Sequence, residues 1–213
     1  MNSLGNPSAG IGHDEEMESW DASLWARSRA GDAAAFGMLF ELHAKAIYNY
    51  CFRRIGDWTA AEDMLSIVFL EAWRRREKEL SADKVLPWLY GIATNVVRNQ
   101  RRSERRFAGA LRRMPETQPE ANFAERSDER LDDERQMRRA LALLSQSPRH
   151  EQEVFVLCAW MELSYEDAAF ALGLPVGTVR SRLSRARRRL RELDPGFGHE
   201  QGGTATVLEA PEP

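Results

Sequence analysis

The chain has 213 residues, enough for one or two domains, and 43% of them are hydrophobic, so it can form real cores. Its 33 acidic and 30 basic residues give a formal net charge of −3, which excludes a chain that is basic throughout. No apolar run approaches the length of a membrane span, and the N-terminus lacks the apolar segment of a signal peptide. We therefore expect a cytoplasmic protein without membrane insertion.

The charges are segregated along the chain, and the net charge hides this. One basic block contains seven arginines and only one acid, Glu104; these arginines are Arg98, Arg101, Arg102, Arg105, Arg106, Arg112 and Arg113. A second basic block covers residues 180–191. An acidic stretch lies between them. Separate basic blocks of this kind are typical of a protein that binds nucleic acid.

Neither a metal site nor a catalytic site is predicted. The two cysteines, Cys51 and Cys158, lie in apolar helical patterns, where buried free thiols are expected. The four histidines show no metal-ligand spacing with them. There is no glycine-rich phosphate loop, carboxylate pair or nucleophile–base set, so we expect no cofactor and no enzymatic activity.

The N-terminal part predicts a disordered segment and three helices. Residues 1–19 are polar and then acidic, and helices are expected at about 20–29, 33–55 and 59–77. Asp32 can cap the second helix, and Thr59 with Glu62 forms a capping-box pattern for the third.

The outer face of the third helix carries Asp63, Ile67 and Leu70. Two aliphatic residues there indicate either a partner surface or a face that a neighbouring element covers.

A polar loop at 78–86 precedes a long helix that is expected to run from Pro87 to about Phe107. Leu89, Ile92, Ala93 and Val96 form its inward face, and another edge carries Trp88, Asn95 and Asn99 beside Arg98 and Arg102. Rings can stack on bases, amides can read exposed base edges and arginines can follow the backbone, so this edge suits single-stranded nucleic acid. A tryptophan at a helix start can equally be a packing residue.

The remaining chain predicts a linker and a second helical domain. Residues 114–130 contain prolines and acids and form an acidic linker between a first domain, 20–113, and a second, 131–193. The second domain has helices at about 131–145 and 148–160, followed by a helix-turn-helix, and the tail 194–213 is expected to be disordered. The fold class is therefore all-α, with two small domains.

The helix-turn-helix lies at residues 163–193. Ser164 can cap its first helix, Gly173 can form the turn and Pro175 suits the first turn of the second helix. Five residues of that second helix recur at helical spacing and predict its buried stripe: Val179, Leu183, Ala186, Leu190 and Leu193.

The opposite face of this helix is suited to duplex DNA. It carries Gly177, Ser181, Ser184, Arg185 and Arg188, with Arg180 on its flank. A bare glycine allows close approach to a duplex, and hydroxyls and arginines can reach base edges and phosphates. The alternative is an arginine-rich face that only meets solvent.

Residues about 20–193 resemble the extracytoplasmic-function (ECF) group of bacterial sigma factors, in the sigma-70 family. The stretch LSYEDAAFALGLPVGTVRSRLSRARRRL is similar to the family's C-terminal DNA-reading region. The blocks GDAAAFGMLFELHAKAIYNYCFRRIGDWTAAEDM, VFLEAWR and PWLYGIATNVVRNQRR are similar, in the same order, to its N-terminal domain.

The resemblance implies a subunit that binds RNA polymerase core, at the clamp of β′ and the flap of β, and directs promoter-specific initiation. Arg180, Ser181, Ser184, Arg185 and Arg188 would contact the −35 element as duplex in the major groove. The −10 element would be captured as melted strand by Trp88, Asn95, Arg98, Asn99 and Arg102. An anti-sigma factor would be a further partner.

The resemblance assigns polymerase binding to Asp63, Ser66, Ile67 and Leu70. Ser66 and Ile67 depart from the family, which usually has glutamine and an acid there, so the polar part of this contact is in question. The alternative function is a helix-turn-helix regulator that acts without core polymerase, as a dimer on palindromic sites.

Overall fold

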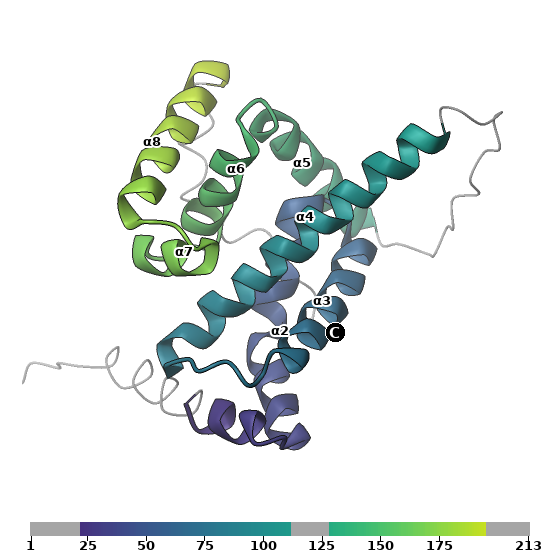
Figure 1. Cartoon of the computed structure of the whole chain (residues 1–213). Coiled ribbons are helices and arrows are strands. Elements are labelled where there is room, and N and C mark those ends of the chain that lie inside the picture. Colours follow the sequence, from purple (N-terminus) through teal and green to yellow (C-terminus); the bar gives the residue numbers. More distant parts are fainter. Residues whose placement is uncertain (1–21, 112–127, 195–213) are drawn as a thin grey trace, which may run out of the picture.

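The structure is a computed structural model that describes residues 22–111 and 128–194. Every regular element in these two ranges is a helix, and neither contains a strand, as the periodicity predicts. The segments 1–19 and 195–213, and the linker up to residue 127, lie outside the described residues. The two described ranges form two helical units, which confirms the all-α, two-domain fold (Figure 1).

The first unit contains a short helical segment at residues 22–29 and the helices α2 (Ala33–Ile55), α3 (Trp58–Arg74) and α4 (Val85–Leu111). α4 packs against both α2 and α3, and its C-terminal part extends beyond them (Figure 1). The apolar faces of the three helices form a core that includes Leu39, Ile47, Phe52, Val68 and Val97.

Local capping fixes both ends of α2, and the cap at Asp32 is the one that the sequence predicts. The Asp32 carboxylate accepts hydrogen bonds from the backbone N–H groups of Ala34 and Ala35, each at 3.0 Å. Gly56 ends the helix in the left-handed conformation, with φ of 74°, which costs glycine little.

The start of α3 differs from the prediction. Thr59 and Glu62 were expected to cap it, but the helix begins at Trp58 and Asp57 is the cap. The Asp57 carboxylate accepts the N–H of Ala60 at 2.9 Å, three residues on. Asp57 and Thr59 lie close together and can both act as N-caps. Asp57 is the N-cap because its backbone is extended.

The segment before α4 contains a short 3-10 helix, η1 (Ala82–Lys84). α4 then begins at Val85, two residues before the predicted start at Pro87. Pro87 still lies in the first turn, where its missing N–H breaks no helical hydrogen bond.

The second unit contains α5 (Asp128–Leu144), α6 (Arg149–Phe155), the π-helical turn η2 (Val156–Trp160), α7 (Tyr165–Leu172) and α8 (Val176–Leu193). α7 and α8 are the predicted helix-turn-helix. The Ser164 hydroxyl accepts the N–H of Asp167 at 3.0 Å, and Gly173 ends α7 with φ of 64°. Pro175 is the residue just before α8, rather than a residue of its first turn.

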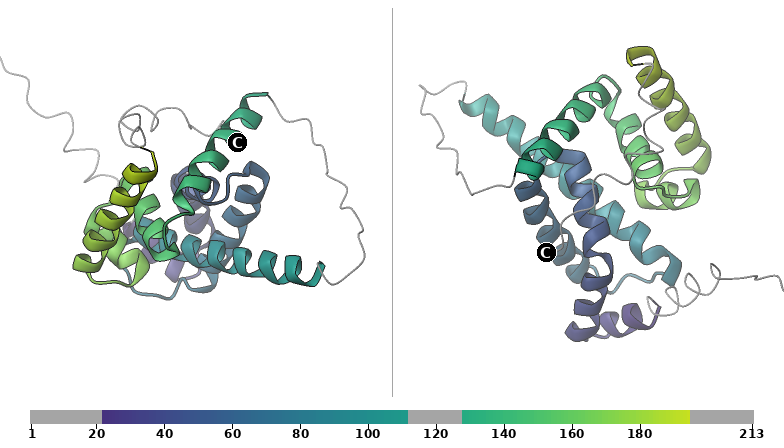
Figure 2. Two further views of the ribbon diagram at one scale, coloured as in Figure 1. Left: turned by 90° about the horizontal axis from the view of Figure 1, so that it is seen from above. Right: turned by 180° about the vertical axis from the view of Figure 1, so that it is seen from behind.

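The two units pack directly on each other (Figures 1 and 2). α7 crosses α4 so closely that a Cβ on Gly91 would lie 2.6 Å from the backbone oxygen of Ala171. α5 lies against the corner between α2 and α3. There Glu134 accepts the N–H of Trp58 at 3.1 Å, and Arg138 donates to the backbone oxygen of Gly56 at 3.1 Å. Buried residues of both units therefore form one continuous core.

Candidate nucleic-acid interface

The inward stripe of α8 is largely as predicted. Val179, Leu183, Ala186 and Leu190 are buried against the rest of the second unit. Leu193, predicted as the fifth member, is 49% exposed because α8 ends at that residue. The stripe fixes the rotation of α8, and the opposite side of the helix therefore faces outward.

The outward side of α8 carries most of the predicted duplex-contacting residues in exposed positions: Arg180, Ser181, Ser184 and Arg188. Gly177 is open, since a Cβ placed on it would meet no atom within 4 Å. In the part of the chain that the structure describes, the ion pairs of Arg180 and Arg188 are long and exposed, 3.8 Å to Glu166 and 3.9 Å to Glu192. Exposed pairs of this length are weak, so both guanidinium groups can reach another anion.

Arg185 differs from its neighbours because it is bonded to α6. Its Nε donates to Oε1 of Glu151 at 3.1 Å, and Arg189 Nη1 donates to the other carboxylate oxygen at 3.1 Å. The Arg185 side chain remains 45% exposed. The sequence did not predict Glu151, since an acid at the start of α6 carries no signal that its partner lies on α8.

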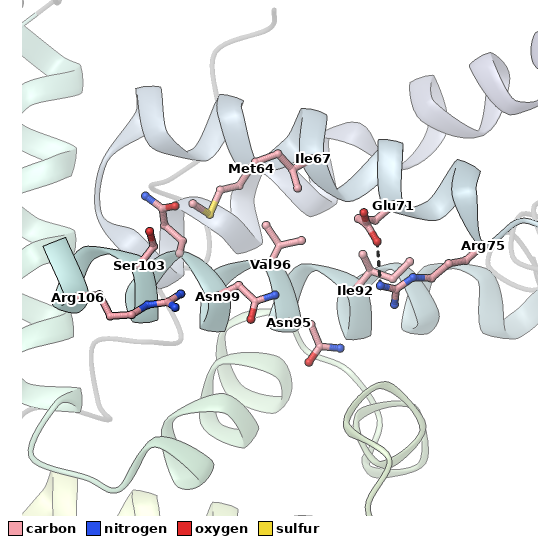
Figure 3. A pocket seen from close by; sticks show the side chains of 11 residues that line it. Met64, Ile67, Glu71, Arg75, Ile92, Asn95, Val96, Asn99, Ser103 and Arg106 are labelled. Carbon is pink, nitrogen blue, oxygen red and sulfur yellow. Dashed lines mark hydrogen bonds and ion pairs between the residues drawn. The ribbon is translucent and has the colours of Figure 1, made fainter.

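On the first unit, the predicted strand-contacting residues Asn95, Asn99 and Arg102 are exposed along α4. Asn95 and Asn99 line a cavity of about 450 Å³ between α3 and α4. Its floor is apolar, with Met64 and Ile67 facing Val96 and Ile92 across it, as Figure 3 shows.

Both ends of this cavity are charged. Glu71 and Arg75 pair at one end, at 2.8 Å, and Arg106 lies at the opposite end (Figure 3). The cavity thus combines an apolar floor with amide and guanidinium groups at its edges, which are the groups that can hold an unstacked base.

Arg98 lies beside this cavity and is bound to the second unit. Its Nε and Nη2 donate to the two carboxylate oxygens of Glu153 on α6, at 2.7 and 2.6 Å. Nη1 also donates to Asn95 Oδ1 at 3.2 Å. The hydrogen bonds to Glu153 raise the pKa of Arg98, so this guanidinium stays charged. No local pattern in the sequence indicates this partner, which is 55 residues away.

Trp88 is a packing residue in this structure, and its predicted role in stacking on a base is corrected. It is only 6% exposed and lies edge-on against Trp25, with ring centroids 4.9 Å apart. A base could reach neither face of its ring without unpacking the N-terminal helical segment. The packing interpretation of this tryptophan therefore holds.

The outer face of α3 carries the four predicted polymerase-binding residues in exposed positions. Ile67 is 45% exposed and Leu70 is 50% exposed, beside exposed Asp63 and Ser66. Within the described residues no element covers this face, so the partner-surface interpretation is favoured. Sequence reasoning missed Met38 and Leu42 of α2, which are also exposed apolar residues.

No group of three or more potential metal ligands occurs in residues 22–111 and 128–194. No helix in those ranges is long and apolar enough to span a membrane.

The two units define an all-α protein whose second unit carries a helix-turn-helix. Residues 39–107 match the family model of sigma-70 region 2, and residues 135–190 match that of sigma-70, region 4. The chain belongs to the sigma-70 family, and it is an RNA polymerase sigma factor of the ECF group.

Its relatives support both statements. The RNA polymerase sigma factor HrpL of Pseudomonas syringae is 34% identical over 144 residues, which cover 67% of this chain and 78% of that protein. The ECF RNA polymerase sigma factor SigL of Mycobacterium tuberculosis is 32% identical over 166 residues, or 76% of this chain and 90% of SigL.

Two solved structures share the fold. CnrH, solved in complex with the cytosolic domain of CnrY, superposes with a TM-score of 0.61 at 27% identity, covering 82% of this chain and 96% of CnrH. The sigma factor RpoE of Bartonella quintana, solved with the anti-sigma factor NepR, gives a TM-score of 0.54 at 24% identity. It covers 74% of this chain and 95% of RpoE.

Proposed function

We propose that this sigma factor directs RNA polymerase core to promoters by reading two elements in two physical states. The −35 element is read as duplex by α8, and the −10 element is captured as melted strand by α4. The observation that carries the proposal is the presence of two exposed polar faces, one on each sigma-70 unit, each with groups suited to one of these states.

For the −35 element, α8 enters the major groove with Gly177 against the duplex. Arg180, Ser181, Ser184, Arg185 and Arg188 contact base edges and nearby phosphates. Arginine can bond two acceptors of one guanine at once, and each such pair contributes about 1–3 kcal/mol of discrimination. The exposure of this side of α8 supports the assignment.

For the −10 element, Asn95 and Asn99 bind an extruded base at the cavity between α3 and α4, and Arg98 and Arg102 bind the strand's phosphates. Extrusion of a base costs a few kcal/mol, which stacking and polar contacts in a pocket offset. The apolar floor and amide edge of the cavity support this role. Binding a phosphate through Arg98 requires its separation from Glu153.

For core polymerase, the exposed face of α3 binds the clamp of β′ through Asp63, Ser66, Ile67 and Leu70, and the second unit binds the flap of β. Ile67 makes an apolar contact where the family usually has an acid. We also propose an anti-sigma factor as a partner, by analogy with RpoE, which was solved with the anti-sigma factor NepR.

The test is transcription in vitro with the purified chain, core polymerase and genomic DNA fragments from the source bacterium. Mapping of the RNA 5′ ends should give start sites that share two sequence elements at a fixed spacing. Core polymerase alone is the control. An absence of chain-dependent start sites from the whole genomic pool would contradict the proposal.

The alternative, a helix-turn-helix regulator that acts without core polymerase, makes a different prediction. It would bind palindromic duplexes as a dimer, with half-sites one helical turn apart. Selection of bound duplexes from the same genomic pool by the chain alone would distinguish it.

A further inference from the structure

Glu151 lies in the first turn of α6, with its carboxylate between α6 and α8. Its side chain is only 3% exposed. One oxygen accepts Nε of Arg185 at 3.1 Å, and the other accepts Nη1 of Arg189 at 3.1 Å. His150 Nε2 is 3.9 Å from the first oxygen. A buried carboxylate is stable only when it is paired, and this one is paired with the DNA-facing helix.

The bond geometry leaves the outer part of Arg185 available. Glu151 engages Nε, and within the described residues no hydrogen bond engages the two Nη nitrogens. A guanidinium group is rigid and planar, so a bond at Nε also fixes the direction in which its other N–H groups point. With 45% of the side chain exposed, those groups can reach beyond the helix surface.

Arg189 lies one turn after Arg185 on α8, and it shares the same carboxylate. The two arginines are therefore held in a fixed relation to each other and to α6. An arginine that is already ordered loses less conformational entropy when it binds a base than a freely rotating one does. The same fixed orientation also weakens binding to a base whose hydrogen-bond acceptors lie in other positions.

We propose that Glu151 is a positioning residue for −35 recognition: it fixes the guanidinium of Arg185 so that its free N–H groups meet one base pair. This inference rests on the proposed function, in which Arg185 contacts the −35 duplex. Glu151 itself touches no DNA. Its removal should therefore reduce sequence discrimination while non-specific affinity is kept or rises, because the chain loses one negative charge.

The experiment compares holoenzymes that contain the wild-type chain, Glu151→Gln or Glu192→Gln. Each binds the −35 duplex found by 5′-end mapping and the same duplex with its −35 bases scrambled, at one salt concentration, with fluorescence anisotropy as the readout. Glu192→Gln is the matched control. It makes the same charge change at an exposed site on α8, where the ion pair found within the described residues is the long one between Glu192 and Arg188, at 3.9 Å.

For Glu151→Gln, we expect the ratio of the two affinities to fall about tenfold, the size of one good base contact, with scrambled binding equal to or tighter than wild type. Glu192→Gln should keep the wild-type ratio. An unchanged ratio in Glu151→Gln would overturn the inference. So would an equal loss on both duplexes, which would mean that Glu151 only holds α6 to α8.

Glu151→Asp provides a second measurement should the glutamine variant fold poorly. It keeps the charge but shortens the side chain, so it cannot reach both arginines. Its affinity ratio should also fall, without a change in the salt dependence of scrambled binding. Full retention of the ratio would overturn the inference. If the wild-type holoenzyme itself does not distinguish the two duplexes, the proposed −35 reading fails instead.

Discussion

At the scale of single residues, the arginines of this sigma factor differ in what holds them. Among residues 22–111 and 128–194, the ion pairs of Arg180 and Arg188 are long and exposed, whereas Arg98 and Arg185 are bonded to the buried carboxylates of Glu153 and Glu151. Exposed pairs contribute about 0–1 kcal/mol, and a bond to a buried charge contributes more. The arginines therefore divide into weakly held groups, with Arg180 also 5.5 Å from the centroid of the Tyr165 ring, and groups bonded to a buried carboxylate.

The exposed aliphatic residues of α3 give a prediction at this scale. Ile67→Lys and Leu70→Glu should each weaken binding to core polymerase by about tenfold or more, because a charge replaces an apolar contact in an interface. Pull-down of the chain by immobilised core polymerase measures this. Leu193→Glu is the control, since Leu193 is 49% exposed at the end of α8. Wild-type binding by both α3 variants would contradict the proposed clamp surface.

The two cysteines give a second prediction for single residues. Burial raises the pKa of the Cys51 thiol to about 12 and that of the half-buried Cys158 thiol to about 11, so both remain protonated at neutral pH. Only the thiolate reacts rapidly with iodoacetamide. We expect slow labelling of both at pH 8, with Cys51 slower, and rapid labelling of both in guanidinium, as mass spectrometry of the intact chain would show. Rapid labelling of Cys51 in the folded chain would contradict its burial.

At the scale of elements, the helices are defined by their ends as much as by their apolar faces. Asp32 and Gly56 cap the two ends of α2, and Gly173 caps the C-terminus of α7; each is a local feature that backbone chemistry favours. At the start of α3, neighbouring residues could each act as the N-cap. Asp57 is the N-cap, and Trp58 is the first helical residue.

The Asp57 cap can be tested by its contribution to stability. Asp57→Ala should lower the free energy of unfolding by about 1 kcal/mol, the usual effect of losing such a cap. Denaturant unfolding followed by circular dichroism measures it. Asp57→Asn is the control, because an amide oxygen can accept the same N–H of Ala60. Equal loss in both variants would show that the charge of Asp57, rather than its capping bond, matters.

At the scale of the whole molecule, the two sigma-70 units are joined by contacts between charged groups as well as by apolar packing. Lys84 pairs with Asp167 at 2.8 Å, and Arg98 pairs with Glu153 at 2.6 Å. Hydrogen bonds to Asp167 and to Asp83 raise the pKa of Lys84 to about 12, so Lys84 is charged at neutral pH and loses its charge as the pH rises through this value. Arg98, to which we assign binding of the −10 strand, therefore also takes part in the contact between the units.

This shared use of Arg98 gives a prediction for the free chain. Glu153→Gln should bind a fluorescent single-stranded oligonucleotide carrying the mapped −10 sequence severalfold more tightly than wild type. The reason is that the hydrogen bonds between Arg98 and a charged carboxylate, a kind of bond that contributes about 1.5–3 kcal/mol, no longer compete with the oligonucleotide. Fluorescence anisotropy measures the affinity. The partial exposure of Arg98 reduces the effect.

Two controls separate this effect from a general change in charge. Asp132→Asn makes the same charge change at an exposed site on α5 and should alter the affinity far less. In the Arg98→Gln background, Glu153→Gln should lose most of its effect, which a double-mutant cycle quantifies. Equal gains in Glu153→Gln and Asp132→Asn would show that Arg98 does not mediate the competition.

The sequence by itself determined the features that depend on neighbours within a few positions. Helical period, the caps at Asp32 and Ser164, the turn at Gly173 and the sigma-70 resemblance are all local or ordered along the chain, and the structure agrees with them. The exposure of Ile67 and Leu70 was also predictable, because the buried stripe of α3 fixes its opposite side.

Only the tertiary structure decided which candidate residues are available to a ligand. Trp88 is covered by Trp25, Arg98 is paired with Glu153, and Arg185 is fixed by Glu151. The partners lie 34 or more residues apart in the two ion pairs, so no local pattern could report them. Burial and charge pairing arise from the packing of helices that are distant in the chain, and these two effects determine what a side chain can still bind.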